Sequence, residues 1–199
     1  DICDFAEVVS EISGECFVPV AAGGGVRSLD HAKLLISNGA DKVVLNTLLF
    51  ENEQVVKEIS SYFGQQCVVG SIDVKRNKLG IPEIYYNNGK RLSSIPYSEL
   101  LSRISVSLVG EIYLNSIDQD GTGQGYDMKL LDDILSPLSV PIIMAGGVGN
   151  AKHLLNGLHA ETVSAAATAH LFNFVGSGLK EARQKLHAAS VRLASWEYY

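Results

Sequence analysis

The sequence predicts a (β/α)8 barrel built from two similar halves. Apolar segments of strand length alternate with amphipathic helical segments along the chain, which is typical of a parallel sheet flanked by helices. A cassette of strand, glycine turn, helix and strand over residues 18–47 also recurs about 120 residues later, over residues 140–167. Strands are expected near positions 18, 43, 68, 112, 142 and 163.

The two cassettes match in motif as well as in order. Val18-Pro19 corresponds to Val140-Pro141, and Gly24-Gly25 corresponds to Gly146-Gly147. The further pairs are Ser28 with Asn150, His31 with His153 and, after a two-residue slip, Asn46-Thr47 with Ala166-Ala167.

By the repeat, the second half of the barrel has four strands in this sequence, but the first half has only two. A barrel of this kind usually has about 250 residues, so two strands and about 55 residues are expected before Asp1. We therefore expect one barrel domain over residues 1–199 that lacks about its first two βα units. An open six-stranded sheet is the alternative, but it would leave apolar strand edges unpaired.

The first cassette places polar groups where a parallel sheet binds ligands. Residues 17–22 read as a buried strand, Ser28 as a helix cap, and Asn46-Thr47 as the end of the next strand. The glycine turn and Asn46-Thr47 then share the carboxyl edge of the sheet, where free backbone N–H groups, a hydroxyl and an amide suit a phosphate. Glycines that merely permit tight turns are the alternative interpretation, and the second glycine turn favours phosphate binding.

The remaining elements follow in order along the chain. A helix opens the chain and ends at Gly14, Asn52 caps a helix, and a strand over residues 67–72 leads into Asp73. The later expectations are a hairpin over residues 81–89, a helix over 98–106, a strand over 111–115, a polar loop followed by a helix capped by Asp127, and a helix over 179–189.

Composition limits the class of protein. The chain has 199 residues, of which 46% are hydrophobic and 19% charged, as in ordinary globular domains. A net charge of −6 gives no indication of nucleic-acid binding, and no apolar run is long enough to cross a membrane. With no signal peptide visible, the expected location is the cytoplasm. The three cysteines form no CxxC motif and share no ligand spacing with the histidines, so neither a metal nor another cofactor is expected.

Asp73 is the main candidate for acid–base chemistry, because it ends a buried strand on the ligand side and burial raises a carboxyl pKa. A capping role, or an ion pair with Lys75 or Arg76, is the alternative. Asp118 and Asp120 lie in the loop after the fourth strand, where either could bind a ligand hydroxyl, cap the loop or be solvated. Asp41, Lys42 and Glu111 begin strands at the opposite mouth, where surface ion pairing is usual, and His170 is expected to pack rather than to catalyse.

Four segments resemble the HisF family, the cyclase subunit of imidazole glycerol phosphate synthase. They are AAGGGVRSLDHAKLLISNGADKVVLNT, VVGSIDVKR, NSIDQDGTGQGYD and IIMAGGVGNAKHLL. The resemblance covers essentially the whole chain and implies a two-fold-repeated (β/α)8 barrel. It also implies a glutaminase partner at the N-terminal mouth, which supplies ammonia, and a bis-phosphorylated substrate, PRFAR. The products would be imidazole glycerol phosphate and AICAR.

Residue by residue, the resemblance makes Asp73 one of two catalytic aspartates, the other belonging to the strand expected before Asp1. It assigns one phosphate site to Gly24, Gly25, Asn46 and Thr47, and the other to Asp120, Gly121, Gly146 and Gly147. Lys42 and Glu111 resemble members of the charged ammonia gate, and Asp41 resembles a residue that faces the glutaminase.

Some positions depart from the family pattern. Ala145 and Ala167 stand where the family usually has Ser, which predicts fewer hydroxyls at the second phosphate site, and Asn115 stands where histidine-pathway cyclases usually have Thr. EISGECFVPVAAGGG and LNSID are closer to a HisF-like branch that supplies ammonia for amidation of a nucleotide-linked sugar in surface-polysaccharide synthesis. The sister isomerase of the pathway and a non-catalytic ammonia conduit are further alternatives.

Overall fold

The computed structural model describes residues 1–133, 138–169 and 177–193, and its centre is a curved sheet of parallel strands. The strands follow the order β1-β2-β3-β6-β7-β8, so each lies beside the next parallel strand in the sequence. They are β1 (Ala21–Gly23), β2 (Lys42–Leu45), β3 (Val68–Arg76), β6 (Glu111–Ser116), β7 (Ile142–Ala145) and β8 (Val163–Ala166). This is the order of consecutive strands in a (β/α)8 barrel, which confirms the predicted fold class.

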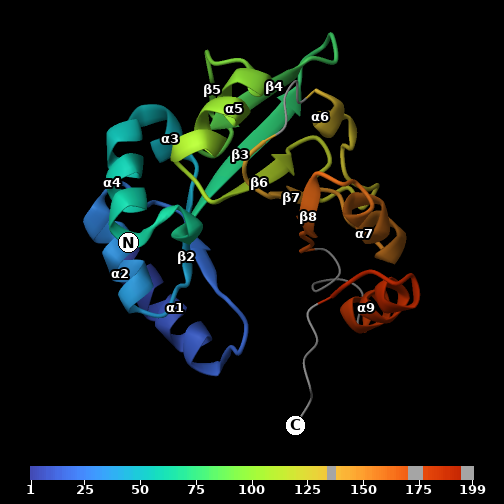
Figure 1. The fold of residues 1–199 in the computed structure, drawn as a ribbon, viewed down its shortest axis with the longest axis horizontal. Helices are drawn as coiled ribbons and strands as arrows, with labels where there is room; N and C mark the ends of the chain where they lie inside the picture. The colour runs from blue at the N-terminus through green and yellow to red at the C-terminus, as the bar shows by residue number, and fades with distance from the viewer. Residues whose placement is uncertain (134–137, 170–176, 194–199) are drawn as a thin grey trace.

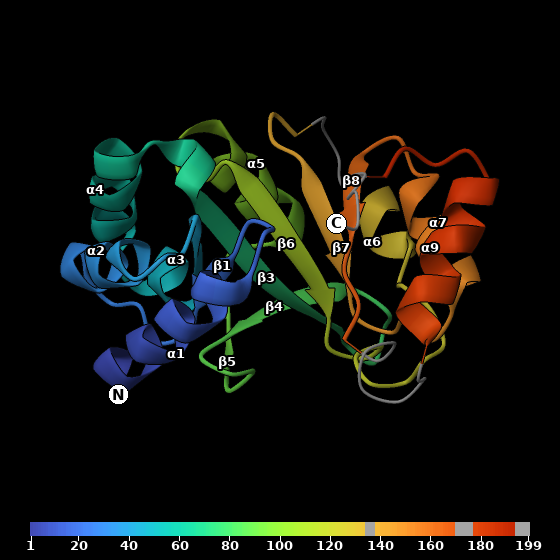
Figure 2. The same ribbon diagram turned by 90° about the horizontal axis from the view of Figure 1, so that it is seen from below.

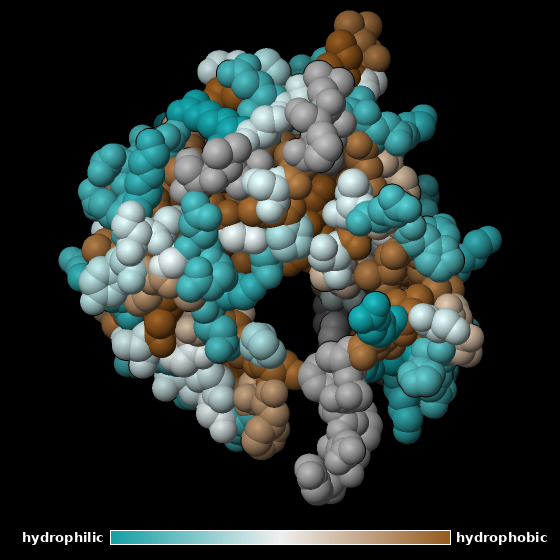
Figure 3. All heavy atoms as spheres, viewed as in Figure 1, coloured by the Kyte–Doolittle hydropathy of each residue, from teal (hydrophilic) through white to brown (hydrophobic). Residues whose placement is uncertain are grey.

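Helices alternate with these strands and lie outside the sheet (Figures 1 and 2). They are α1 (Ile2–Glu15), α2 (Leu29–Ser37), α3 (Thr47–Glu51), α4 (Glu53–Phe63), α5 (Tyr97–Ser107), α6 (Lys129–Asp132), α7 (Ala151–Leu158) and α9 (Gly178–Ala188), with a 3-10 turn η1 (Gln65–Cys67). Figure 3 shows the molecule hollowed between the N-terminal and the C-terminal elements. Within the described ranges, each helix is too short or too polar to span a bilayer.

A hairpin extends the sheet at the carboxyl end of β3. Strand β4 (Pro82–Tyr86) pairs antiparallel with β3, and β5 (Arg91–Leu92) pairs with β4. The predicted turn at Asn87, Asn88 and Gly89 is confirmed, with φ of 54°, 58° and 72°. Because β4 pairs with Asp73–Arg76, β3 continues past the predicted end of the strand, and Asp73 lies within it.

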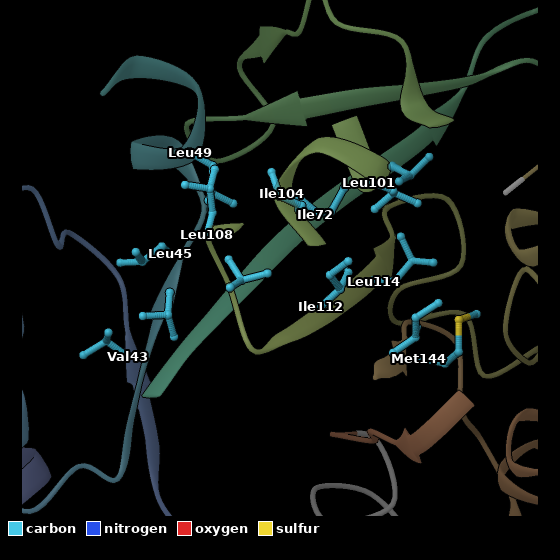
Figure 4. Close-up of a cluster of buried hydrophobic side chains, with 14 of the residues drawn as sticks. Val43, Leu45, Leu49, Ile72, Leu101, Ile104, Leu108, Ile112, Leu114 and Met144 are labelled. Atoms are coloured by element: carbon cyan, nitrogen blue, oxygen red, sulfur yellow. The ribbon is translucent and has the colours of Figure 1, made fainter. Parts of the chain in front are cut away.

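The parallel strands alternate between two faces, as extended chains must. Outward-facing residues such as Ile72, Ile112 and Leu114 are fully buried against helices, including Leu101 and Ile104 of α5 (Figure 4). The half-buried residues between them face inward and include Lys42, Val44, Ser71, Asp73, Glu111, Tyr113 and Asn115. The inner face therefore carries the polar side chains, while the outer face supplies the core.

The predicted helix caps are mostly correct. Ser28 accepts a hydrogen bond from His31 N, its counterpart Asn150 accepts from His153 N, and Asn52 accepts from Val55 N. The prediction that Asp127 caps a helix is wrong, because α6 begins at Lys129 and the Asp127 carboxylate instead binds Arg76.

The predicted buried strand over residues 17–22 forms only at its last two residues. Strand β1 covers Ala21–Gly23, the residues that pair with Lys42–Val44, and Phe17 is 100% exposed. The apolar residues begin earlier in the chain than the backbone pairing that defines β1. His170 and the C-terminal aromatic residues fall outside the described ranges.

Candidate active site

Asp73 is held between two carboxamides at the carboxyl end of the sheet. Asn115 Nδ2 donates to Asp73 Oδ1 at 3.0 Å, and Asn46 Nδ2 donates to Asp73 Oδ2 at 3.3 Å. Asn46 Nδ2 also donates to the backbone oxygen of Ser71 at 2.9 Å. Asn115 and Asn46 belong to the segments on either side of β3, so the carboxylate is fixed from both neighbours. Within the described residues Asp73 forms no ion pair with Lys75 or Arg76, and Arg76 instead binds Asp127 and Asp133.

The pKa of Asp73 is raised above its usual range, chiefly because burial disfavours the charged carboxylate. The hydrogen bond from Asn115 opposes this shift by stabilising the ionised form, and the nearby negative charge of Asp120 adds to it. A half-buried carboxyl group with a raised pKa can both accept and return a proton. The geometry therefore fits the acid–base role that the sequence predicts for Asp73.

The first glycine turn opens into a cavity of about 550 Å³. Gly24 and Gly25 line it with φ of 110° and 78°, and a methyl group on either would meet no atom within 4 Å. Thr47 and Asp73 also line the cavity, together with the exposed guanidinium of Arg27, which has no ion-pair partner among the described residues. Backbone N–H groups, a hydroxyl and a cation at one cavity suit an anion. The Asn46 side chain is directed to Asp73 and Ser71 and so positions the acid.

The second glycine turn lines a smaller cavity of about 140 Å³. Gly146 and Gly147 have φ of 88° and 97°, and the wall includes Asp120, Gly121 and Tyr113. A methyl group on Gly147 would lie 2.2 Å from the carbonyl oxygen of Gly125, so the turn is packed against the loop after β6. The Asp120 carboxylate is exposed and would repel a nearby anion, so this side chain suits a ligand hydroxyl better than a phosphate.

The structure corrects the alignment of the repeat at its last two positions. Ala166 pairs with Met144 of β7, and Val43 pairs with Ala22, the repeat counterpart of Met144. Ala166 therefore corresponds to Val43 rather than to Asn46. Three residues further along each chain segment, Ala169 is the counterpart of Asn46, and the register shift between β7 and β8 at Ile142–Ile143 contributes to the difference. Thr168 lines the second cavity, and its Oγ1 is buried without a hydrogen-bond partner among the residues that the structure describes. A hydroxyl is therefore present at this site despite Ala167.

The two histidines matched by the repeat have the same structural role. Arg27 N donates to His31 Nδ1 at 3.3 Å, and Gly149 N donates to His153 Nδ1 at 3.2 Å. Each ring thus holds the backbone just after its glycine turn. These contacts favour a supporting role for both histidines.

The predicted gate residues lie at the opposite end of the inner face. Lys42 and Glu111 begin β2 and β6, and their side chains form an ion pair across β3, with both half-buried. Asp41 lies beside them, where its Oδ2 accepts a hydrogen bond from Val20 N at 2.8 Å. The carboxylate of Asp41 therefore fixes the entry to β1 within this chain.

Sequence reasoning missed the network that holds the loop after β6. Arg76 donates to Asp127 through Nε at 2.7 Å and binds Asp133 at 3.2 Å, while its backbone N–H donates to Asp118 at 2.7 Å. Asp118 is thereby a cap of the loop. Tyr113 was also missed, because an aromatic residue in a strand is usually read as core. Tyr113 alternates with Glu111 and Asn115 along β6, and this pattern could have placed it on the inner face.

No group of three or more His, Cys, Asp or Glu residues in the described ranges is arranged to hold a metal ion. The site is built from the Asp73 carboxyl group, the two amides that fix it, and two cavities with glycine turns. All lie at the carboxyl ends of the strands, where (β/α)8 enzymes bind their substrates.

The chain is similar to known proteins along most of its length. Residues 4–176 match the family model described as "Histidine biosynthesis protein". A relative from Parasynechococcus marenigrum is 45% identical over 98% of this chain and 73% of its own length. Another from Pseudomonas aeruginosa is 38% identical over 85% of this chain and 68% of its own length. Both are named "Putative imidazole glycerol phosphate synthase subunit hisF2". The chain therefore belongs to the HisF family of histidine-biosynthesis proteins.

Proposed function

We propose that this protein is the cyclase subunit of an imidazole glycerol phosphate synthase. In this reaction, ammonia from a glutaminase converts PRFAR into imidazole glycerol phosphate and AICAR. The observation that carries the proposal is the position of Asp73, on the same rim as both glycine-turn cavities and on the inner face between them. A substrate with a phosphate at each end would lie across Asp73 with its ends in the two cavities.

The first phosphate would bind the N–H groups of Gly24 and Gly25 and the hydroxyl of Thr47. The second would bind at Gly146 and Gly147, with Thr168 supplying the hydroxyl. Asp73 would then transfer protons during addition of ammonia and ring closure, because its raised pKa lets it both take up and release a proton.

Ammonia would enter beside the Lys42–Glu111 ion pair and travel along the inner face to Asp73. Asn46 lies four positions after Lys42 along β2, which is about 13 Å of extended chain. Neutral ammonia can cross such a partly apolar path far more easily than ammonium, because burying an unpaired charge is costly. A glutaminase docked at this mouth is the partner that the proposal requires.

The test is turnover of PRFAR with ammonium salt by the purified protein. We expect imidazole glycerol phosphate to form, with loss of activity in Asp73→Asn and retained activity in Asn156→Asp, an exposed change on α7. Absence of turnover in the wild-type protein would overturn the cyclase proposal.

One observation favours a second function, the delivery of ammonia for amidation of a nucleotide-linked sugar. Asn115, at the position where histidine-pathway cyclases usually have Thr, uses its amide to hold Asp73. In that case the protein would bind a glutaminase and increase glutamine-dependent amidation by a partner enzyme, without converting PRFAR. A conduit that leaves Asp73 unused would tolerate Asp73→Asn in the amidation assay.

A further inference from the structure

The β4–β5 hairpin lies over the first anion cavity, with its turn in the cavity wall. Asn87 and Asn88 line the cavity together with Gly24, Thr47 and Asp73. We propose that this turn recognises the part of the ligand attached to the phosphate, and that this part is a hydroxyl-bearing chain, as in a polyol or sugar phosphate. The proposal rests on the anion-binding function proposed for the first cavity.

The backbone of the hairpin sets its position relative to Asp73. Tyr85 of β4 is directly opposite Asp73 in the antiparallel ladder, and Asn87 follows two residues later. Two residues of extended chain span about 7 Å, so the turn begins within the reach of a small ligand bound at Asp73. The acid and the turn are therefore held on one continuous piece of sheet.

Two side-chain contacts hold the hairpin against α3, the helix that begins at Thr47. Tyr86 stacks on Phe50 with ring centroids 4.7 Å apart and an interplanar angle of 16°. Arg91 of β5 binds Glu51 at 2.9 Å. Because α3 also carries the cavity residue Thr47, the hairpin and the anion site have a fixed relative position.

The carboxamides of Asn87 and Asn88 are available to a ligand. Among the other amides in the cavity wall, Asn46 is used by Asp73 and Ser71, and Asn52 caps α4 through Val55 N. Neither Asn87 nor Asn88 makes a side-chain hydrogen bond to another described residue, although Asn87 lies half-buried. A carboxamide both donates and accepts hydrogen bonds, which matches a hydroxyl group, whereas a phosphate only needs donors.

The size of the cavity agrees with a ligand part larger than a phosphate. The first cavity measures about 550 Å³ and the second about 140 Å³. The N–H groups and the guanidinium for an anion lie at the glycine turn and Arg27, and the amides without a side-chain partner lie on the hairpin. The Glu51 carboxylate, also in the wall, is paired with Arg91. The phosphate and its hydroxyl-bearing attachment would therefore contact different elements.

The positive φ values determine which substitutions give a clean test. Asn tolerates the left-handed region better than most residues, and Gly adopts it without strain. The double change Asn87→Gly/Asn88→Gly therefore removes both amides while keeping the turn. Asn88→Asp keeps the side-chain shape and adds a negative charge, and Asn156→Asp on α7 adds the same charge away from the cavity.

The experiment measures binding of inorganic phosphate, glycerol 3-phosphate and ribose 5-phosphate by calorimetry. We expect the wild-type protein to bind the esters at least fivefold more tightly than inorganic phosphate. The double glycine variant should lose at least fivefold in ester affinity and less than twofold in phosphate affinity, with its thermal melting curve unchanged. Asn88→Asp should weaken the esters and Asn156→Asp should not.

Equal affinities for phosphate and esters in the wild-type protein, or parallel losses for all three ligands in the double variant, would overturn this proposal. The cyclase proposal fails separately. Hairpin-dependent ester binding without turnover of PRFAR would reject the cyclase and keep the recognition role. Turnover of PRFAR with an unchanged KM in the double variant would keep the cyclase and reject the recognition role of the hairpin.

Discussion

Alanine substitution of matched glycines in the two turns should have different effects, although their backbones are alike. Gly25 and Gly147 have φ of 78° and 97°, so an alanine at either position is strained by about 1–2 kcal/mol. A methyl group on Gly25 meets nothing within 4 Å, whereas one on Gly147 lies 2.2 Å from the carbonyl oxygen of Gly125. The loop that carries Gly125 must then move.

That movement adds a second cost for Gly147→Ala. Gly125 N donates to Gly147 O at 2.7 Å, and a hydrogen bond of this kind contributes about 0.5–1.5 kcal/mol. We therefore expect Gly147→Ala to lower the free energy of unfolding by roughly 3 kcal/mol and Gly25→Ala by roughly 1–2 kcal/mol. In a chain of this length, 1 kcal/mol corresponds to about 2–4 °C in Tm.

Urea unfolding followed by circular dichroism measures both losses, and Gly14→Ala is the control. Gly14 lies in helix α1 without a positive φ, and a methyl group there meets no atom within 4 Å. Alanine at Gly14 should leave stability unchanged or raise it by up to about 1 kcal/mol. Equal losses for Gly25→Ala and Gly147→Ala would refute the argument that loop packing distinguishes the two turns.

Three further predictions concern Asp73, Asp127 and Thr168. Asp73→Asn should be more stable than the wild-type protein near neutral pH, because burial raises the Asp73 pKa and makes ionisation unfavourable, and urea unfolding across pH measures the difference. Asp127→Asn should cost about 1–2 kcal/mol in urea unfolding, because its pair with Arg76 is mostly buried. Thr168→Val should weaken binding of inorganic phosphate about threefold to tenfold in calorimetry, because it removes from the second cavity a hydroxyl that pairs with no other described residue.

Each of these three predictions has its own control or its own result that would contradict it. The gain from Asp73→Asn should be largest above the raised pKa and disappear as the pH falls below the usual pKa of aspartic acid, so a gain that persists in acid would contradict the linkage argument. Lys57→Ala removes a more exposed pair with Glu53 and should cost less than about 0.5 kcal/mol. An equal cost for Asp127→Asn would show that burial does not strengthen the pair with Arg76. Unchanged phosphate affinity in Thr168→Val would remove this hydroxyl from the site.

Local patterns predicted the strands and helices well, because the apolar spacing and the capping residues lie within single elements. Ser28, Asn52 and Asn150 could be identified for this reason. The errors arose where the outcome depends on a distant partner. Asp127 has the sequence context of a cap, but the guanidinium of Arg76, 51 positions away, takes its carboxylate. Phe17 is apolar, yet no strand forms there, because β1 is limited to the residues that pair with β2.

The residue types of the site, and the edge of the sheet on which they lie, were predicted correctly. The direction of each side chain was predicted less well. Asn46 was expected to bind phosphate, but its amide faces Asp73, a contact that depends on the register of β2 and β3. Thr168 was overlooked because the register of β7 and β8 differs from that of β1 and β2, so the repeat does not align residue by residue after Ala166. Both differences follow from how neighbouring strands align, which a single sequence does not encode locally.

The alternation of inward-facing and outward-facing residues along β3 explains why Asp73 is half-buried and held in place. Asp73 lies in β3 between Ile72 and Val74, which face the core and are almost completely buried. These neighbours fix the backbone, so the half-buried carboxyl group of Asp73 stays on the inner face, in the wall of the first cavity. Its only described compensation is the pair of amides from Asn46 and Asn115, both provided by neighbouring strand ends. The raised pKa is therefore a direct consequence of placing a carboxyl group on the inner face of a central strand, and moving it to a loop would remove the property that acid–base chemistry needs.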